Sequence, residues 1–166
     1  SQVEESLTLL ISQEMGKDYR RASFEVAGTV RNVQYFSEEI VAALQSETIA
    51  HGSELQYRPL GVVAVISPWN YPLAMANNLL LPALLAGNSV ILKPSEETPL
   101  VADLFVKTLN QFLPEGLFQV AHGGADTGKA LVDSDINMVA FTGSLATGKQ
   151  IMASAASSLK RLVMEL

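Results

Sequence analysis

Five short apolar segments, separated by segments of helical length, dominate the chain from residue 62 onward. The apolar segments cover residues 62–66, 89–92, 117–121, 136–141 and 162–164, and the helical segments lie between them at 73–85, 100–112, 127–132 and 147–157. Strands that are buried on both faces are apolar throughout, and parallel strands need a long crossover, usually a helix, to connect them. The pattern therefore predicts an α/β fold with a doubly wound parallel sheet of about five strands.

The first 49 residues follow a different pattern. They contain no proline, and apolar residues recur at helical spacing, as at Leu7, Leu10 and Ile11. We expect Gly16 to separate two helices, a polar link at residues 50–54 to follow them, and a short strand at 55–59. The predicted organisation is an N-terminal helical segment, residues 1–54, that packs on a sheet domain, residues 55–166.

The composition of the chain argues against several classes of function. The chain is 48% hydrophobic and 17% charged, which indicates a soluble folded domain, and its formal net charge of -6 argues against a nucleic-acid partner. No apolar segment approaches the roughly 20 residues of a membrane span. Cysteine is absent and histidine occurs only at His51 and His122, so we expect no metal site and a cytoplasmic, reducing location.

The segment SPWNYP, residues 67–72, directly follows the apolar segment 62–66. Proline cannot continue a sheet ladder, so the two prolines end the strand and stiffen the turn after it. Trp69 and Asn70 are therefore presented at the carboxyl end of a strand. In parallel α/β folds, this is where ligands bind.

Two further segments, residues 123–129 and 143–149, fit the pattern Gly-x-x-x-x-Gly-Lys of a nucleotide-phosphate loop. Ala130 and Gln150 stand where the loop needs a hydroxyl for Mg²⁺, which disfavours a P-loop NTPase. Two other interpretations stay open. Gly128 and Gly148 could simply let helices pack close to the sheet, or the helix that begins at Ser144 could hold a diphosphate with its free N–H groups.

Taken together, the motifs resemble the aldehyde dehydrogenase superfamily. They lie, in family order and at similar spacing, at residues 68–72, 82–88, 93–99, 113–116, 141–144 with Gly148, and 165–166. The resemblance implies that the sheet domain is Rossmann-like and binds NAD(P). It also implies that the catalytic domain, which carries the nucleophilic cysteine, is absent from this chain. We therefore expect a piece of a longer protein that forms a homodimer or homotetramer.

The resemblance also implies which residues bind the cofactor. Lys93 and Glu96 would contact the adenosine ribose with Ser95 nearby, and a carboxylate there suits the free 2′-hydroxyl of NAD. NADP stays possible because Lys93 and Ser95 could accept a phosphate. The full implied set is Ile66, Ser67, Pro68, Trp69, Asn70, Lys93, Ser95, Glu96, Gly124, Gly128, Phe141, Thr142, Gly143, Ser144 and Thr147.

Two residues are implied to take part in the oxidation of an aldehyde to a carboxylic acid through a thiohemiacetal on the absent cysteine. The side-chain amide of Asn70 would supply half of an oxyanion hole, and Glu165 would be the general base that activates the hydrolytic water. Without the resemblance, Asn70 would be interpreted as a turn residue and Glu165 as a chain-end charge. A noncatalytic member of the family, which binds NAD or has a structural role, is the other alternative.

The resemblance says less about the aldehyde itself. Tyr71, Met75 and Asn78 fall on the helix that walls the substrate tunnel in the family. Asn78 offers no positive charge where enzymes that oxidise semialdehydes can carry arginine. This weakens an assignment to succinate semialdehyde and leaves the aldehyde class open.

Overall fold

The structure, a computed structural model, describes residues 1–166. Its elements, in chain order, are α1 (Gln2–Met15), α2 (Tyr19–Ala43), β1 (Glu47–Ala50), β2 (Ser53–Leu55), β3 (Val62–Ile66), α3 (Ala74–Leu85), β4 (Ser89–Lys93), α4 (Pro99–Leu109), β5 (Phe118–Val120), α5 (Ala125–Asp133), β6 (Met138–Thr142), α6 (Leu145–Ala156) and β7 (Arg161–Glu165). None of the helices is both long enough and apolar enough to pass through a bilayer.

The central sheet has five strands in the order β5-β4-β3-β6-β7, and every neighbouring pair is parallel. This confirms the predicted doubly wound fold. The chain enters at β3 in the middle, builds outward to β5, and then returns to place β6 on the other side of β3. Because the winding reverses between β3 and β6, the carboxyl edge there is the expected ligand position in such a sheet.

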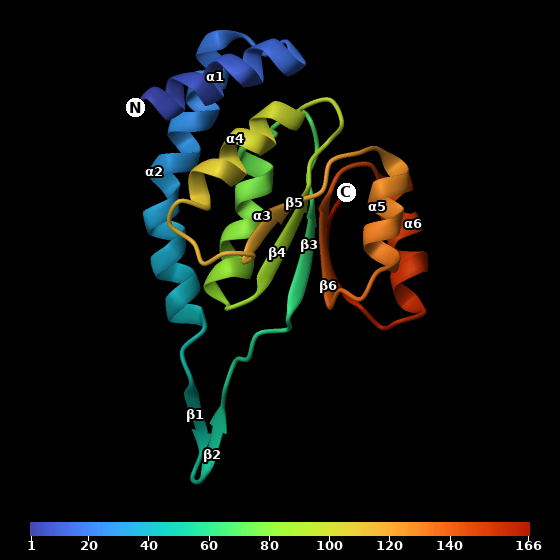
Figure 1. Ribbon diagram of the computed structural model, residues 1–166. Helices are drawn as coiled ribbons and strands as arrows, with labels where there is room; N and C mark the ends of the chain where they lie inside the picture. Colours follow the sequence, from blue (N-terminus) through green and yellow to red (C-terminus); the bar gives the residue numbers. More distant parts are fainter.

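Helices cover both faces of the sheet, as Figure 1 shows: α1 to α4 lie on one side, and α5 and α6 lie on the other. Alternating side chains of β3 pack into two hydrophobic cores, one on each face of the sheet. Val63 and Val65 are buried with the first group of helices, whereas Ala64 and Ile66 are buried with the second. A strand that is buried on both faces must be apolar at every position, which explains the unbroken run at residues 62–66.

The N-terminal part differs from the prediction in one respect. Gly16 ends α1 with φ 72° and so separates two helices, as expected. However, the helical reading of residues 47–49 was wrong, because β1 and β2 form an exposed antiparallel hairpin that projects from the body (Figure 1). The strand expected at residues 55–59 lies at Ser53–Leu55 instead. The turn is made by Gly52 at φ 80°, a backbone conformation that glycine adopts without strain.

Carboxylates from the N-terminal helices cap two helices of the sheet domain. Glu14 accepts the backbone N–H groups of Leu100 and Val101 at the start of α4, at 2.8 and 2.9 Å. Glu25 does the same at the start of α3. A negative charge at a helix N-terminus is favourable because it satisfies free N–H groups and opposes the helix dipole. These bonds fix the N-terminal helices to the domain.

At the amino edge of the sheet, Asn88 ties three segments together. It is buried, its side-chain oxygen accepts the N–H groups of Leu60 and Gly61 at 2.7 and 3.1 Å, and its side-chain nitrogen donates to the carbonyl of Ala83. Replacing Asn88 by alanine should lower the free energy of unfolding by about 1–3 kcal/mol, because a buried side chain that makes three hydrogen bonds is removed and two partly buried N–H groups lose their acceptor. Chemical denaturation measures this. Gln119→Ala, at an exposed position, is the control, and an equally small change in both variants would contradict the prediction.

Candidate functional site

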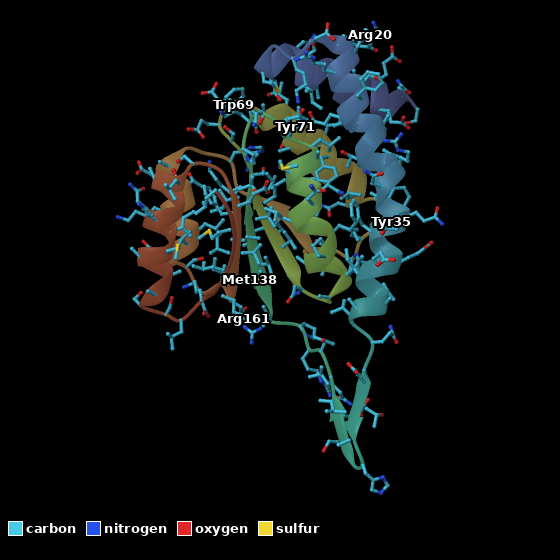
Figure 2. All side chains as sticks on the ribbon, turned by 180° about the vertical axis from the view of Figure 1, so that it is seen from behind. Arg20, Tyr35, Trp69, Tyr71, Met138 and Arg161 are labelled. Carbon is cyan, nitrogen blue, oxygen red and sulfur yellow. The ribbon has the colours of Figure 1, made fainter.

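The predicted site residues collect along the carboxyl edge of the sheet. In the register of the strands, Ile66 is paired with both Lys93 and Phe141, and Thr142 is paired with Glu165. Figure 2 shows Trp69 and Tyr71 at this end of the sheet, and Met138 and Arg161, which begin β6 and β7, at its other end. The turn after β3, the loop after β4, the start of α6 and the end of β7 therefore share one edge.

The turn after β3 presents Asn70 to solvent while its backbone is held from behind. Ser67 continues the pairing with β4 by donating its N–H to the carbonyl of Lys93 at 3.2 Å. The carbonyl of Asn70 accepts a bond of 2.7 Å from Lys17 Nζ, and the side chain of Asn70 is exposed. Trp69 is 52% exposed, which does not fit a residue that packs in the core.

Beyond β4, the side chains of Lys93 and Glu96 lie together. Lys93 is buried, and its Nζ is 3.5 Å from Glu96 Oε2. The backbone N–H of Glu96, together with the charge of Lys93, holds the pKa of the Glu96 carboxyl below its ordinary value. The carboxylate is therefore ionised at neutral pH and is protonated only in acid. An ionised, exposed carboxylate can accept two hydroxyl hydrogen bonds, as a ribose diol would require.

The first turn of α5 faces this pair. A Cβ added to Gly124 would lie 3.8 Å from Glu96 Oε1, and one added to Gly128 would lie 3.9 Å from Lys93 Cδ. Those distances are ordinary van der Waals contacts, so Gly128 is not needed for close packing against the sheet. The structure thus brings together four residues from two segments that are distant in the sequence, 93–96 and 124–128.

A cavity of about 540 Å³ opens between this cluster, α5 and α6. Five of the predicted residues line it: Ile66, Lys93, Gly124, Gly128 and Thr147. Seven more complete it: Ala125, Asp126, Lys129, Val132, Gln150, Ile151 and Ser154. Sequence reasoning missed these seven, although their three- and four-residue spacing, as in 147, 150, 151 and 154, marks one face of each helix. Lys93 lines this cavity and the carboxylate of Glu96 lies beside Lys93, so a slot between two helices adjoins an ionised carboxylate. Such a slot can hold a flat heterocycle, with its sugar next to the carboxylate.

The N-terminus of α6 lies at the same edge. Ser144 caps this helix, since its Oγ accepts the N–H of Thr147 at 3.2 Å and donates to Thr147 Oγ1 at 2.9 Å. The remaining N–H groups of the first turn are free to bind an anion such as a diphosphate. An added Cβ at Gly148 would meet the tip of the Leu166 side chain, which is exposed and free to move aside, so the glycine is not required there for close packing.

Three predicted residues are placed differently from the others. Phe141 is buried in the core beneath Gly143, so its side chain packs and only its backbone reaches the edge. Ser67 is buried, and its Oγ has no hydrogen-bond partner. Glu165 is exposed at the end of β7, where its Oε2 accepts a bond of 3.2 Å from Thr142 Oγ1. This bond holds a carboxylate at the edge where a water could reach it.

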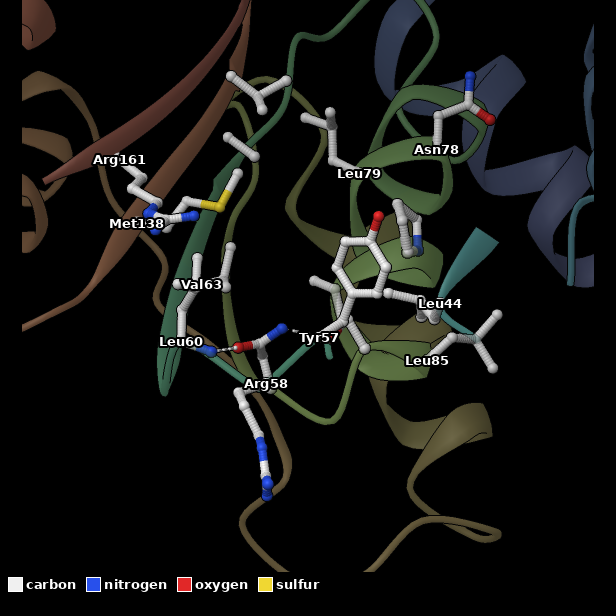
Figure 3. Close-up of a pocket in the computed structure, with 16 residues that line it drawn as sticks. Leu44, Tyr57, Arg58, Leu60, Val63, Asn78, Leu79, Leu85, Met138 and Arg161 are labelled. Carbon is white, nitrogen blue, oxygen red and sulfur yellow. Dashed lines mark hydrogen bonds between the residues drawn. The ribbon is translucent and has the colours of Figure 1, made fainter. Parts of the chain in front are cut away.

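A second cavity, of about 530 Å³, lies on the opposite face of the sheet, between α3 and strands β3, β6 and β7 (Figure 3). Its lining is mostly apolar and includes Leu79, Met138 and Val163. None of the predicted cofactor residues lines this cavity, but Asn78 does. Predicted cofactor residues thus line the cavity on one face of the sheet. Asn78, which the resemblance puts on the wall of the substrate tunnel, lines the cavity on the other face.

The whole chain, residues 1–166, matches the family model described as the aldehyde dehydrogenase family. The chain belongs to the aldehyde dehydrogenase family. It is 36% identical over 173 residues to D-glyceraldehyde dehydrogenase (NADP(+)) of Picrophilus torridus, with 100% of this chain and 35% of that protein covered. It is 38% identical over 170 residues to succinate-semialdehyde dehydrogenase of Paenarthrobacter nicotinovorans, with 98% and 38% covered.

Solved structures agree with the aldehyde dehydrogenase fold. A point mutant of betaine aldehyde dehydrogenase from Staphylococcus aureus, in complex with NAD+, superposes with a TM-score of 0.88 at 30% identity, and the match covers 98% of this chain and 34% of that chain. This chain spans about a third of the length of the curated aldehyde dehydrogenases that it matches. The predicted membership of the aldehyde dehydrogenase superfamily and the predicted Rossmann-like fold are thereby confirmed.

Proposed function

We propose that this chain is the cofactor-binding part of an NAD(P)-dependent aldehyde dehydrogenase. "The complete dehydrogenase" below means the longer polypeptide in which this chain is joined to a catalytic part that carries the cysteine. The observation that carries the proposal is the cluster of Lys93, Glu96, Gly124 and Gly128 beside the capped N-terminus of α6. Membership of the aldehyde dehydrogenase family supports the assignment of that cluster to a nicotinamide cofactor.

The residues present fit a dinucleotide. Glu96 would accept the ribose hydroxyls, the first turn of α6 after Ser144 would bind the diphosphate, and the cavity between α5 and α6 would take the adenine. When bound, the nicotinamide accepts a hydride. Relatives are named for NADP and solved with NAD, so the family allows both. The ionised Glu96 favours NAD here because it would repel a 2′-phosphate.

Asn70 and Glu165 would act on the aldehyde. The exposed amide of Asn70 would donate to the oxygen that becomes an alkoxide when the thiolate attacks, and its backbone is already fixed. Glu165, which Thr142 orients, would take a proton from the water that cleaves the thioester. Both roles use groups at the edge where the cofactor residues also lie.

The substrate class is an aldehyde, and the proposal does not extend to a single compound. Relatives are named for D-glyceraldehyde and for succinate semialdehyde, and the exposed Asn78 brings no charge that would select a carboxylate substrate. The oligomeric state and the cytoplasmic location stay predictions.

Aldehyde-dependent formation of NADH by the complete dehydrogenase, followed by its absorbance with a panel of aldehydes, tests the proposal. Binding of NAD without turnover of any aldehyde would favour the noncatalytic alternative. Family membership leaves the P-loop NTPase without support, and ATP binding that requires Mg²⁺ would revive it. The chain of residues 1–166 has no cysteine, so it should form no NADH by itself.

Replacing Glu96 by glutamine should weaken NAD binding by about tenfold to a hundredfold, because hydrogen bonds to a charged group contribute roughly 1.5–3 kcal/mol. NADP should lose less, since the repulsion of its 2′-phosphate also disappears. Calorimetric titration of the complete dehydrogenase with both cofactors measures this. Glu97→Gln, at the exposed neighbouring position, is the control.

Acidification gives a second measurement at the same residue. Because the pKa of Glu96 is lowered, NAD affinity should be constant through neutral pH and should fall only below the ordinary carboxyl range. Equal losses of NAD and NADP in Glu96→Gln would count against the ribose assignment.

A further inference from the structure

A buried ion pair lies directly behind the turn that carries Asn70. The side chain of Glu25, on α2, is fully buried, and that of Lys17, in the link between α1 and α2, is 9% exposed. Lys17 Nζ lies 2.5 Å from Glu25 Oε2. The other carboxylate oxygen, Oε1, accepts the N–H groups of Leu73 and Ala74 at 3.0 and 3.2 Å. The carboxylate is therefore paired with a cation and also caps the start of α3.

Lys17 also contacts the turn after β3 directly. It donates to the carbonyl of Asn70 at 2.7 Å, and its Nζ lies 3.8 Å from the centroid of the Tyr71 ring. Figure 2 shows Tyr71 on the side of the turn that faces the N-terminal helices, and Trp69 on the other side. One ion pair thus holds the turn at Asn70, at Tyr71 and at the first residues of α3.

Stability alone is a poor explanation for this pair. Removing two charges from water is costly, so a buried ion pair often contributes no more than a well-packed apolar pair would. What the pair does provide is a fixed position. The backbone of Asn70 is held by a short charged hydrogen bond, whereas its side chain is exposed at the carboxyl edge of the sheet, where the candidate site lies.

We propose that Lys17 and Glu25 are positioning residues that hold the amide of Asn70 where the reacting aldehyde oxygen will lie. The inference rests on the proposed function, because it concerns the oxyanion donor of that reaction. A donor stabilises the alkoxide only when it is already aimed at it, and a displacement of about 1 Å in a reacting geometry can cost about a hundredfold in rate. In this proposal the N-terminal helical segment positions an oxyanion donor in addition to stabilising the fold.

Four variants of the complete dehydrogenase test this: Lys17→Met, Glu25→Gln, the double variant, and Lys17→Met combined with Asn70→Ala. Lys17→Met should lower single-turnover NADH formation at saturating aldehyde by about tenfold to a hundredfold, with an unchanged dissociation constant for NAD. It should also lower the melting temperature, because the buried carboxyl group of Glu25 loses its cationic partner. In the Asn70→Ala background the same change should cost less than about twofold, because the group that it positions is gone.

The double variant separates positioning from stability. With both charges removed, the melting temperature should recover toward that of the wild type, but the rate should stay low because the carbonyl of Asn70 has lost its donor. Asn88→Ala is the matched control: it removes a buried polar clamp at the opposite edge of the sheet, so it should lower the melting temperature without changing the rate per folded molecule.

Recovery of both rate and stability in the double variant would overturn the inference. A full rate loss from Lys17→Met in the Asn70→Ala background would also overturn it. The same holds if the rate loss in Lys17→Met only reflects a smaller folded fraction, as is expected for Asn88→Ala. A wild-type dehydrogenase that binds NAD but turns over no aldehyde would overturn the proposed function, and this inference with it. An active wild type with normal rates in Lys17→Met and in Glu25→Gln would overturn the inference alone.

Discussion

Replacing Asn70 by alanine should lower the turnover of the complete dehydrogenase by about 10²–10³, or roughly 3–4 kcal/mol in activation free energy. This is the typical effect of removing one oxyanion-hole donor. The loss should lie in the chemical step. NAD binding should change little, because Lys93, Glu96 and the start of α6 lie outside the turn that carries Asn70. Single-turnover formation of NADH and calorimetric titration with NAD, on one preparation, measure the two effects separately.

The competing interpretation of Asn70 gives the opposite pattern. If its side chain only braces the turn, alanine should lower the melting temperature and leave the rate per folded molecule near that of the wild type. The bond that fixes this turn uses the backbone carbonyl of Asn70, which alanine keeps. We therefore expect little change in stability. Asn32→Ala, on the exposed surface of α2, controls for the loss of an exposed amide.

The sheet was predictable because its three inner strands, β4, β3 and β6, are largely buried on both faces. A run such as residues 62–66 can satisfy two cores only as a central parallel strand, so its position in the fold follows from composition alone. The hairpin of β1 and β2 was not predictable in the same way. Every residue of its two strands is exposed, so no burial pattern distinguishes them from a polar link.

The grouping of the candidate site residues at one edge was predictable in part, for similar reasons. Loop residues such as Glu96 and Ser144 follow strand ends, and parallel strands bring their carboxyl ends to one edge. Side chains that line the cavity from within helices, such as Gln150, are harder to assign, because the face that a helix turns toward a ligand depends on how it packs.

The ion pair behind Asn70 could not be predicted at all. Lys17 is 53 residues from Asn70, and Glu25 is 48 residues from Leu73. An acidic residue on an amphipathic helix is usually exposed, so Glu25 gives no sign in the sequence that it is buried. Only the docking of α2 against α3 shows that this carboxylate has a partner on each side.

Replacing Glu165 by glutamine should separate the two halves of the reaction. Glutamine keeps the size of the side chain and can still accept the bond from Thr142, but it cannot take a proton from water. The first turnover should therefore still form NADH, while steady-state turnover should fall by about 10²–10⁴, the usual contribution of general acid–base catalysis. Rapid mixing of the complete dehydrogenase with aldehyde and NAD should show a burst that stops near one equivalent per active site.

The pH dependence of the burst distinguishes the roles that Glu165 could have. If Glu165 serves only the hydrolytic water, the burst rate should keep the wild-type pH profile, whereas the slow phase should lose its dependence on a carboxyl group. If the carboxylate also helps to ionise the cysteine, the burst should slow as well and should recover at alkaline pH, where the thiol ionises without a base. Glu115→Gln, an exposed carboxylate on another loop, should change neither phase. Wild-type steady-state turnover in Glu165→Gln would mean that this carboxylate is an ordinary surface charge at the end of β7.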